Sequence, residues 1–320
     1  MKALVLNALH QPLSYSEVPD PVAPEGWSVV TLRAAALNHR DVFITRGLYA
    51  GIRFPAILGS DGAGERQGKP VVIYPAFDWG DQPGFQGKQF RLLGMPDNGT
   101  FAEKIAVPAD HVFPKPAHLS WEQAAALPLA GLTAWRTLFT RCRLQKGEKV
   151  LISGIGGGVA LAAMQFALLA GAEVYVTSGS AAKIEKAVAL GATAGVSYRE
   201  EGWDKRLKQE AGGFDVIFDS AAGDGFALFP ALCNPGARIG VYGGSLGKVN
   251  GLSMQPVFWK QISILGSTMG TLAEFAEMLS FVEKHTIVPV VDSVFPLSEG
   301  NAAFAKMDRG EQFGKIVLHM

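Results

Sequence analysis

Cysteine is scarce in this chain of 320 residues, and only Cys142 and Cys233 are present. Two cysteines are too few for a disulfide framework or for a cysteine-rich zinc site. Long apolar runs are also missing, because the longest, residues 159–172, is interrupted by Gln165 and is too short to cross a bilayer. The N-terminal segment lacks the long apolar region of a secretory signal and is interpreted as a strand. We therefore expect a cytoplasmic protein without a membrane partner.

An excess of charge of one sign is lacking too, since 29 basic residues balance 29 acidic ones. A protein whose main partner is a nucleic acid or an acidic membrane carries an excess of positive charge, so neither partner is expected. Charged residues make up 18% of the chain, below the ~25% of an average protein. With 38 glycines, this composition predicts a large core and many tight turns rather than disorder. The length predicts two domains.

The first 120 residues consist mainly of short runs that are typical of β-strands. The runs at 28–37, 69–77 and 101–109 are bounded by turn residues, and long helical periodicity is scarce. Residues 78–100 have no periodicity and are interpreted as a surface excursion. This part of the chain is therefore expected to form a β-rich domain.

Strands and helices alternate from Glu148 onward, which predicts a doubly wound parallel sheet of the α/β class. Shortly before this region, Ser120 and Gln123 form a capping-box pattern that predicts the start of a helix. The expected strands are 149–153, 173–177, 195–197, 215–219, 237–242 and 262–267. The expected domains are a Rossmann domain over 121–265 and a β-rich domain made of 1–120 and 266–320.

A glycine-rich turn follows the first of these strands and precedes a helix; its glycines are Gly154, Gly156, Gly157 and Gly158. Backbone without side chains lets a pyrophosphate approach closely, and the helix N-terminus offers free N–H groups and a positive dipole end. The turn departs from the strict G-x-G-x-x-G pattern, since it matches only as Ile155-x-Gly157-x-x-Ala160. A turn without function is the alternative, but the flanking strand and helix favour a dinucleotide bound at Gly156, Gly157, Gly158 and Val159.

The residues after the second strand indicate which dinucleotide is preferred. An NAD site usually has an acidic residue ~20 positions after the glycines, which binds the ribose 2′-OH. Here that position is Thr177, with Ser178 and Lys183 nearby and no Asp or Glu beside it. A hydroxyl and an ammonium can bind the 2′-phosphate of NADPH, and Tyr198 after the third strand can join them. We predict NADPH as the cofactor; the alternative is that Lys183 is an ordinary solvated helix residue.

Several segments resemble the medium-chain dehydrogenase/reductase superfamily, and within it the zinc-free quinone oxidoreductase (zeta-crystallin-like) branch. They extend over nearly the whole chain and comprise ALNHRDVFITRGLY (36–49), FPAILGSDGAGE (54–65), AALPLAGLTAW (125–135), the glycine-rich turn and SYREEGW (197–203). The resemblance implies a Rossmann domain joined to a GroES-like catalytic domain. It also implies a homodimer, because the segment from Gly266 to Gly270 resembles the edge strand through which relatives dimerise.

The zinc alcohol dehydrogenases of this superfamily bind their catalytic zinc through three segments. In this sequence the corresponding positions hold Asn38, Ser60 and Leu129. A catalytic zinc needs three side chains with lone pairs to donate, whereas Asn and Ser are poor ligands and Leu is none. The structural zinc loop needs four cysteines, and residues 78–100 contain none. We therefore expect neither metal.

Zinc-free relatives reduce quinones or α,β-unsaturated aldehydes and ketones with NADPH, and the resemblance implies this activity here. Such acceptors are already electron-poor, so the protein mainly orients them, excludes water and supplies hydrogen bonds. The resemblance implies that Asn38 and Tyr49 contact the acceptor oxygen and that Thr133 binds the nicotinamide carboxamide. Asp41 is expected to orient the loop, and either Tyr49 or solvent supplies the proton. The plainer alternatives are a turn residue for Asn38, a loop aromatic for Tyr49 and an ordinary helix residue for Thr133.

Three further segments are expected to border the ligand. Gly243, Gly244 and Ser245 follow a later strand, at the edge where ligands bind such sheets. Gly266 begins the edge segment of the resemblance, and Gly314 lies in the C-terminal segment 313–315. Two other functions stay open: a zinc-independent alcohol or carbonyl dehydrogenase, and an NADPH-binding protein without turnover.

Overall fold

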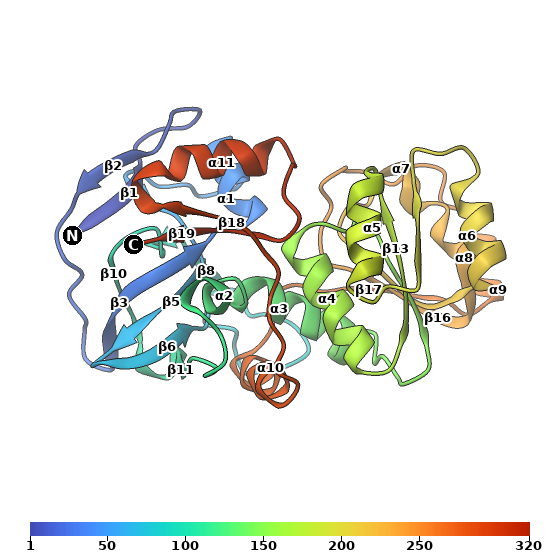
Figure 1. The fold of residues 1–320 in the computed structure, drawn as a ribbon, viewed down its shortest axis with the longest axis horizontal. Helices are drawn as coiled ribbons and strands as arrows, with labels where there is room; N and C mark the ends of the chain where they lie inside the picture. Colours follow the sequence, from blue (N-terminus) through green and yellow to red (C-terminus); the bar gives the residue numbers. More distant parts are fainter. The chain divides into compact units, whose positions relative to one another are not determined.

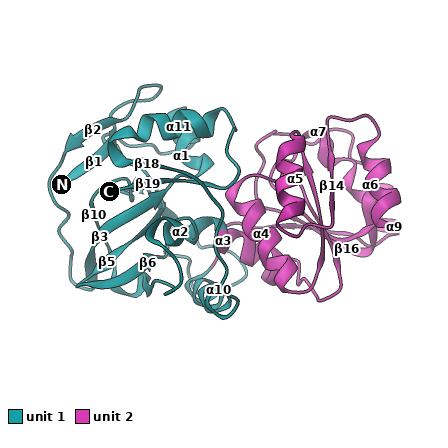
Figure 2. Ribbon diagram, in the orientation of Figure 1, with its two compact units in different colours: residues 1–130, 271–320 teal, residues 131–270 magenta.

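The computed structural model describes all 320 residues, and the chain forms two units (Figures 1 and 2). Unit 1 contains residues 1–130 and 271–320, and unit 2 contains residues 131–270. No helix is both long enough and apolar enough to span a membrane.

The unit boundaries differ from those expected from the sequence. The structure divides the chain after residues 130 and 270, whereas the sequence pattern places the divisions after 120 and 265. The capping box is present, because Ser120 Oγ accepts the Gln123 N–H at 3.2 Å and Gln123 Oε1 accepts the Ser120 N–H at 2.9 Å. However, the helix that it starts, α2 (Trp121–Ala125), packs against the strands of unit 1. A capping box marks the start of a helix, and tertiary packing decides the unit to which the helix belongs.

Unit 1 is built around a seven-stranded sheet with β3 (Trp27–Ala36) near its centre. The middle of β3 alternates between exposed and buried residues, as expected of a strand with one face on a core. The last strand of the chain, β19 (Lys315–His319), pairs antiparallel with β3 and sets Val317 opposite Ala36 (Figure 1). The C-terminal strand therefore lies beside the segment that follows β3. The path of the sheet is β11-β6-β5-β3-β19-β18, and β10 pairs with β3.

The remaining helices and strands that begin in unit 1 are β1 (Lys2–Leu6), β2 (Ser14–Glu17), α1 (His39–Thr45), β4 (Ala56–Ile57), β5 (Asp61–Arg66), β6 (Lys69–Ile73), β7 (Ala76–Phe77), β8 (Arg91–Leu93), β9 (Pro96–Asp97), β10 (Lys104–Pro108), β11 (Val112–Pro114), α3 (Pro128–Trp135), α10 (Leu272–Lys284), β18 (Val291–Pro296) and α11 (Gly300–Asp308). The strand expected at the N-terminus is thus confirmed as β1. The chain passes from unit 1 to unit 2 within α3.

The interpretation of residues 78–100 as a surface excursion is wrong for their second half. Strands β8 and β9 form a small sheet with β7 there, and Leu93 and Met95 are buried. Strands of two or three residues are too short to show a periodicity, so their sequence does not predict them. They form where Leu93 and Met95 pack into the apolar core of unit 1.

Unit 2 contains a six-stranded sheet in which every neighbouring pair of strands is parallel. The strand order is β14-β13-β12-β15-β16-β17, which confirms the Rossmann-like sheet and all six expected strands. The bounds are β12 (Lys149–Ile152), α4 (Gly158–Leu169), β13 (Glu173–Ser178), α5 (Ala181–Ala189), β14 (Ala194–Ser197), α6 (Trp203–Ala211), β15 (Phe214–Asp219), α7 (Gly223–Phe226), α8 (Phe229–Leu232), β16 (Cys233–Val241), α9 (Met254–Trp259) and β17 (Ser263–Gly266).

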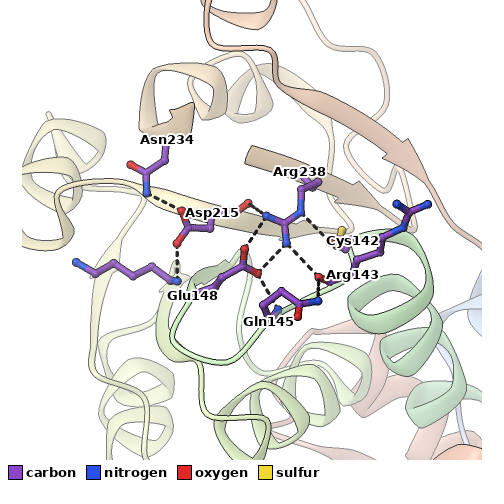
Figure 3. Close-up of polar contacts among 8 residues, drawn as sticks. Cys142, Arg143, Gln145, Glu148, Asp215, Asn234 and Arg238 are labelled. Atoms are coloured by element: carbon purple, nitrogen blue, oxygen red, sulfur yellow. Dashed lines mark hydrogen bonds and ion pairs between the residues drawn. The ribbon is translucent and has the colours of Figure 1, made fainter. Parts of the chain in front are cut away.

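A polar network holds the amino ends of these strands together (Figure 3). Arg238 pairs with Glu148 through two hydrogen bonds of 2.7 and 2.9 Å, and it also donates to the carbonyl of Asp215 at 3.2 Å. The Asp215 carboxylate accepts the Lys149 N–H at 2.9 Å and the Asn234 amide at 2.9 Å. Ligands bind parallel sheets at the opposite, carboxyl ends of the strands. We therefore regard this network as structural.

Replacing Arg238 by Met is expected to lower the free energy of unfolding by about 2–4 kcal/mol, because Glu148 is left largely buried and unpaired. Denaturant unfolding measures the change. Adding Glu148→Gln removes the unpaired charge and should recover part of the loss, while the affinity for a nicotinamide cofactor stays at the wild-type value in both variants. Wild-type stability of Arg238→Met, or a loss of nicotinamide cofactor binding by the folded variant, would contradict the structural role.

The two cysteines are both buried and unpaired. Burial raises the pKa of both the Cys142 and the Cys233 thiol to about 12, so they stay protonated near neutral pH. Reactive cysteines have lowered pKa values and partial exposure. The cysteines are therefore part of the core of unit 2.

Candidate active site and nucleotide site

The carboxamide of Asn38 is held in one orientation by two buried charged groups. Lys315 Nζ donates to Asn38 Oδ1 at 2.7 Å, and Asn38 Nδ2 donates to Asp61 Oδ2 at 3.0 Å. Lys315 and Asp61 also form an ion pair at 2.8 Å, with their side chains 5% and 0% exposed. An ammonium only donates and a carboxylate only accepts, so this pair prevents the amide from rotating by half a turn. The second N–H of Nδ2 has no partner in the chain and can bind a ligand oxygen.

Three distant segments assemble this arrangement. Asn38 precedes α1 directly after β3, and the pairing of β19 with β3 places Lys315 beside it. Asp61 opens β5, and its second oxygen accepts the Leu129 N–H at the start of α3 at 2.7 Å. A Cβ on Gly314 would lie 2.4 Å from the Val290 carbonyl oxygen, which explains why glycine precedes Lys315. Gly314 thus serves the packing of unit 1.

The sequence pattern did not identify Asp61 as a site residue, and it placed Lys315 only within a C-terminal segment near the ligand. Asp61 directly follows Ser60, which stands at one of the zinc positions. A carboxylate next to such a position is the only feature of the sequence that could have identified Asp61 as a site residue. Nothing local points to its ion pair with a residue 254 positions away.

Asp41 is fully buried and supports Asn38 from the first turn of α1. Its Oδ2 accepts the Asn38 N–H at 2.8 Å, whereas its Oδ1 has no partner. Burial is the largest effect on this carboxyl and raises its pKa to about 6. Asp41 therefore orients the start of α1, as the resemblance implies.

Replacing Asp41 by Asn is expected to abolish part of the pH dependence of stability. The raised pKa means that folded Asp41 keeps a proton that the unfolded chain loses, so wild-type stability falls as the pH rises from about 4 to about 6. The full difference is about 3 kcal/mol, because one pKa unit corresponds to about 1.4 kcal/mol. The side chain of Asn at position 41 can still accept the Asn38 N–H and carries no charge to bury. The variant is therefore expected to be more stable than the wild type above pH 6. Denaturant unfolding between pH 4 and 7 measures this, and an unchanged slope in the variant would contradict it.

Tyr49 lies in the loop after α1, and its side chain is 40% exposed. Its ring centroid is 5.6 Å from the guanidinium carbon of Arg40. Its hydroxyl forms no hydrogen bond with the chain, so it is available to a ligand or to solvent.

The positions that bind catalytic zinc in alcohol dehydrogenases do not suit a metal in this chain. Besides Asn38, they hold Ser60, whose hydroxyl donates to the Leu93 carbonyl at 2.8 Å and accepts from Arg40 Nη1 at 2.7 Å. The third position is Leu129, which has no donor atom in its side chain. No three His, Cys, Asp or Glu side chains lie close enough together to hold a metal ion. A guanidinium bound to Ser60 also disfavours a second cation there.

The glycine-rich turn of unit 2 connects β12 to α4, and it fits a dinucleotide pyrophosphate. Gly157 caps the N-terminus of α4, a helix of 12 residues whose first N–H groups have no intrahelical partners. Gly156 has a φ of 129°, and a Cβ there would lie 2.8 Å from Lys183 Cδ. Only glycine therefore allows the Lys183 side chain to extend from α5 across the turn. The structure thus places the Lys183 side chain beside Gly156.

A second set of side chains gathers at the carboxyl end of β13. The neighbouring strand β14 sets Ser197 level with Ser178, so the residues after both strands come together. A Cβ on Gly179 would lie 2.8 Å from both the Tyr198 hydroxyl and Arg199 Nε. The Ser178 hydroxyl is used in the turn, where it accepts the Ser180 N–H at 3.3 Å and donates to the Ile155 carbonyl at 3.4 Å.

Arg199 was missed by the sequence analysis, although it directly follows Tyr198, which was identified by its position after a strand. Its position one residue after Tyr198, at the same end of β14, was the available signal. Arg199 has no ion pair, and the adjacent Glu200 is paired with Arg206 at 2.8 Å. Lys183, Tyr198 and Arg199 therefore present two cations and one hydroxyl at the end of β13.

The other expected cofactor residues of unit 2 lie in two places. Most lie at the carboxyl ends of strands, and Thr133 lies on α3. Gly243, Gly244 and Ser245 come after β16, and the Ser245 N–H donates to the Ser220 carbonyl at 3.3 Å. Gly266 ends β17, and its carbonyl accepts from Arg141 at 2.8 Å. Thr133 is buried on α3, with its hydroxyl 3.8 Å from Met269 Sδ. Gly314 alone lies in unit 1.

A GroES-like unit and a Rossmann-like unit together define the medium-chain dehydrogenase/reductase class of oxidoreductase. Residues 24–117 match the alcohol dehydrogenase GroES-like domain, and residues 158–284 match the zinc-binding dehydrogenase domain. The zinc-type alcohol dehydrogenase-like protein YogA of Leptosphaeria maculans is 32% identical over 98% of this chain and 96% of its own length.

Two solved structures are similar over their whole length. An NAD-dependent alcohol dehydrogenase superposes with a TM-score of 0.95 at 34% identity, with both chains covered completely. The quinone oxidoreductase of Thermus thermophilus, solved also with NADPH, superposes with a TM-score of 0.83 at 30% identity, again with both chains covered completely. The chain belongs to the medium-chain dehydrogenase/reductase superfamily, whose members bind a nicotinamide cofactor.

Proposed function

We propose that this chain is an NADPH-dependent oxidoreductase that transfers a hydride to a quinone or an α,β-unsaturated carbonyl compound without a metal. The observation that carries the proposal is the buried Asn38 carboxamide, which Asp61 and Lys315 hold as a hydrogen-bond donor at a position where zinc-dependent relatives have a ligand. A neutral donor stabilises charge that develops on an acceptor oxygen. It does not ionise an alcohol, the task that zinc performs as a Lewis acid.

The proposed reaction assigns separate tasks to the residues of unit 1. When bound, NADPH supplies the hydride, which adds to an electron-poor carbon of the acceptor. The electron pair of the conjugated bond moves to the carbonyl oxygen, which accepts a hydrogen bond from Asn38 Nδ2. Asp41 orients the backbone of Asn38, and Lys315 with Asp61 orients its amide. Water or Tyr49 then protonates the reduced acceptor.

The preference for NADPH over NADH rests on Lys183, Tyr198 and Arg199. Two cations and a hydroxyl suit a phosphate, and Thr177 stands where NAD sites usually have a carboxylate. One similar structure is described as NAD-dependent and another was solved with NADPH, so similarity alone leaves both cofactors open. The residues at the end of β13 favour NADPH.

We also propose that the protein forms a homodimer through the edge of the unit 2 sheet. Strand β17 is the last strand in the order of that sheet and has one unpaired edge. The adjacent helix α9 exposes Phe258 and Trp259. Sedimentation or scattering in solution tests this assembly.

The test of the reaction is NADPH oxidation with a panel of quinones, enals and enones, in the presence and absence of a chelator. We expect turnover that the chelator does not affect and no oxidation of simple alcohols with NADP⁺. Oxidation of alcohols alone would support a zinc-independent alcohol dehydrogenase instead. Tight NADPH binding without reduction of any acceptor would support a non-catalytic binding protein. Loss of turnover with the chelator would overturn the metal-free mechanism.

A further inference from the structure

Arg40 is a buried cation that forms no ion pair. Its exposed fraction is 8%, and its charge acts against the burial that raises the pKa of the neighbouring Asp41 carboxyl, without a direct bond between the two side chains. Its two hydrogen bonds go to neutral oxygens, the Ser60 hydroxyl at 2.7 Å and the Leu93 carbonyl at 2.8 Å. Buried charges in proteins are normally paired with an opposite charge or satisfied by hydrogen bonds.

Most of the hydrogen-bonding capacity of this guanidinium is unused. Both bonds are made by Nη1, whereas a guanidinium has five N–H donors, so three donors on Nε and Nη2 have no partner in the chain. The Arg40 Nε is fully buried and unpaired. A buried donor without a partner destabilises the folded protein, and a positive charge makes that cost larger. These donors therefore suit a ligand that offers an oxygen acceptor.

The position of Arg40 connects it to the Asn38 donor. Both residues lie at the start of α1, and their partners Ser60 and Asp61 are consecutive residues at the start of β5. The ring of Tyr49 stands 5.6 Å from the guanidinium, and its side chain is 40% exposed. The guanidinium thus lies just beneath a residue that solvent and small molecules reach.

We propose that Arg40 is a catalytic residue that binds the acceptor oxygen as it becomes negatively charged. This inference rests on the proposed function, whose quinone and enone acceptors become a phenolate or an enolate when hydride adds. As the hydride adds to carbon, the electron pair displaced onto oxygen forms an oxyanion, and the free N–H groups of Arg40 donate to it until water supplies a proton. Such charge-assisted bonds are about twice as strong as neutral ones and are strengthened where water is excluded.

A stable phenolate tests the assignment without turnover. The absorbance of 4-nitrophenol distinguishes its charged from its neutral form, so titration into the full chain reports both affinity and ionisation. We expect the wild type to bind the phenolate in preference to the phenol and to lower the pKa of the bound probe. Arg40→Met is expected to reduce phenolate affinity about 10²-fold, because charge-assisted bonds are lost.

Two variants separate ligand binding from a structural role. Arg40→Lys can still donate to Ser60 and Leu93, so it should keep the melting temperature of the wild type but lose most of the phenolate affinity, because an ammonium lacks the planar fork. Arg53→Met removes one exposed arginine from the same unit and should bind the phenolate like the wild type.

The outcomes distinguish failure of this assignment from failure of the proposed reaction. The protein could bind the phenolate through Arg40 and yet reduce no acceptor. That result would support the oxyanion site and refute the proposed reaction. Reduction of quinones or enones with equal phenolate affinity in wild type and Arg40→Met would overturn the role of Arg40. Absence of phenolate binding by the wild type, or equal loss in Arg53→Met, would overturn it as well.

Discussion

Replacing both Lys183 and Arg199 by alanine is expected to weaken NADPH binding about a thousandfold while leaving NADH binding nearly unchanged. The two nucleotides differ only in the 2′-phosphate, and these two cations lie where β13 and β14 end. A hydrogen bond to a charged group is worth roughly 1.5–3 kcal/mol, so the loss of two corresponds to about 10²- to 10⁴-fold. Each single variant should weaken NADPH binding about tenfold or more. Fluorescence titration with each nucleotide measures both dissociation constants.

Lys186→Ala is the matched control for this experiment, because Lys186 is an exposed cation on the same helix as Lys183. Its removal changes the net charge by one unit, as each of the single variants does, but should leave the ratio of NADPH to NADH affinity at the wild-type value. Equal losses for both nucleotides in the double variant would remove the phosphate argument and leave the cofactor choice to other residues.

Replacing Asn38 by Leu is expected to lower kcat for quinone or enone reduction by about 10²- to 10³-fold, the usual effect of removing one donor to a developing oxyanion. Leu fills a similar volume, and the Lys315–Asp61 ion pair that surrounds it stays intact. The dissociation constant of NADPH should not change, since the glycine-rich turn, Lys183 and Arg199 lie in unit 2 and Asn38 lies in unit 1. Steady-state kinetics and nucleotide titration on the same sample test both statements. A variant with wild-type kcat would contradict the role of Asn38.

The positioning roles of Lys315 and Asp61 need a different variant, because removing one buried charge alone destabilises the fold. Lys315→Met by itself leaves Asp61 unpaired and should cost about 3–5 kcal/mol of stability. Adding Asp61→Asn removes both charges and should restore most of that stability. If the pair serves to orient the Asn38 amide, kcat stays low in the stable double variant while KM changes little. Recovery of kcat together with stability would show that the pair is purely structural.

The folds of the two units follow from patterns that a single sequence displays. The parallel strands of unit 2 are continuous apolar runs separated by helices, and hydrophobic periodicity is a local property that the chain carries before it folds. The absence of zinc ligands at Asn38, Ser60 and Leu129 is equally a matter of residue identity. The short strands β8 and β9 were not predicted, because two or three residues are too few to establish a period.

The sequence by itself therefore determined the class of the fold, the glycine-rich turn after the first strand of unit 2, and the residues that stand at the zinc positions, all of which are matters of residue identity and local pattern. Only the tertiary structure decided which side chains meet. The bond between Lys315 and Asn38 spans 277 positions and exists because β19 pairs with β3, and the unused donors of Arg40 become apparent only once every neighbour is in place. Local patterns encode secondary structure through periodicity, whereas contacts between distant residues depend on strand register and packing, which no local pattern specifies.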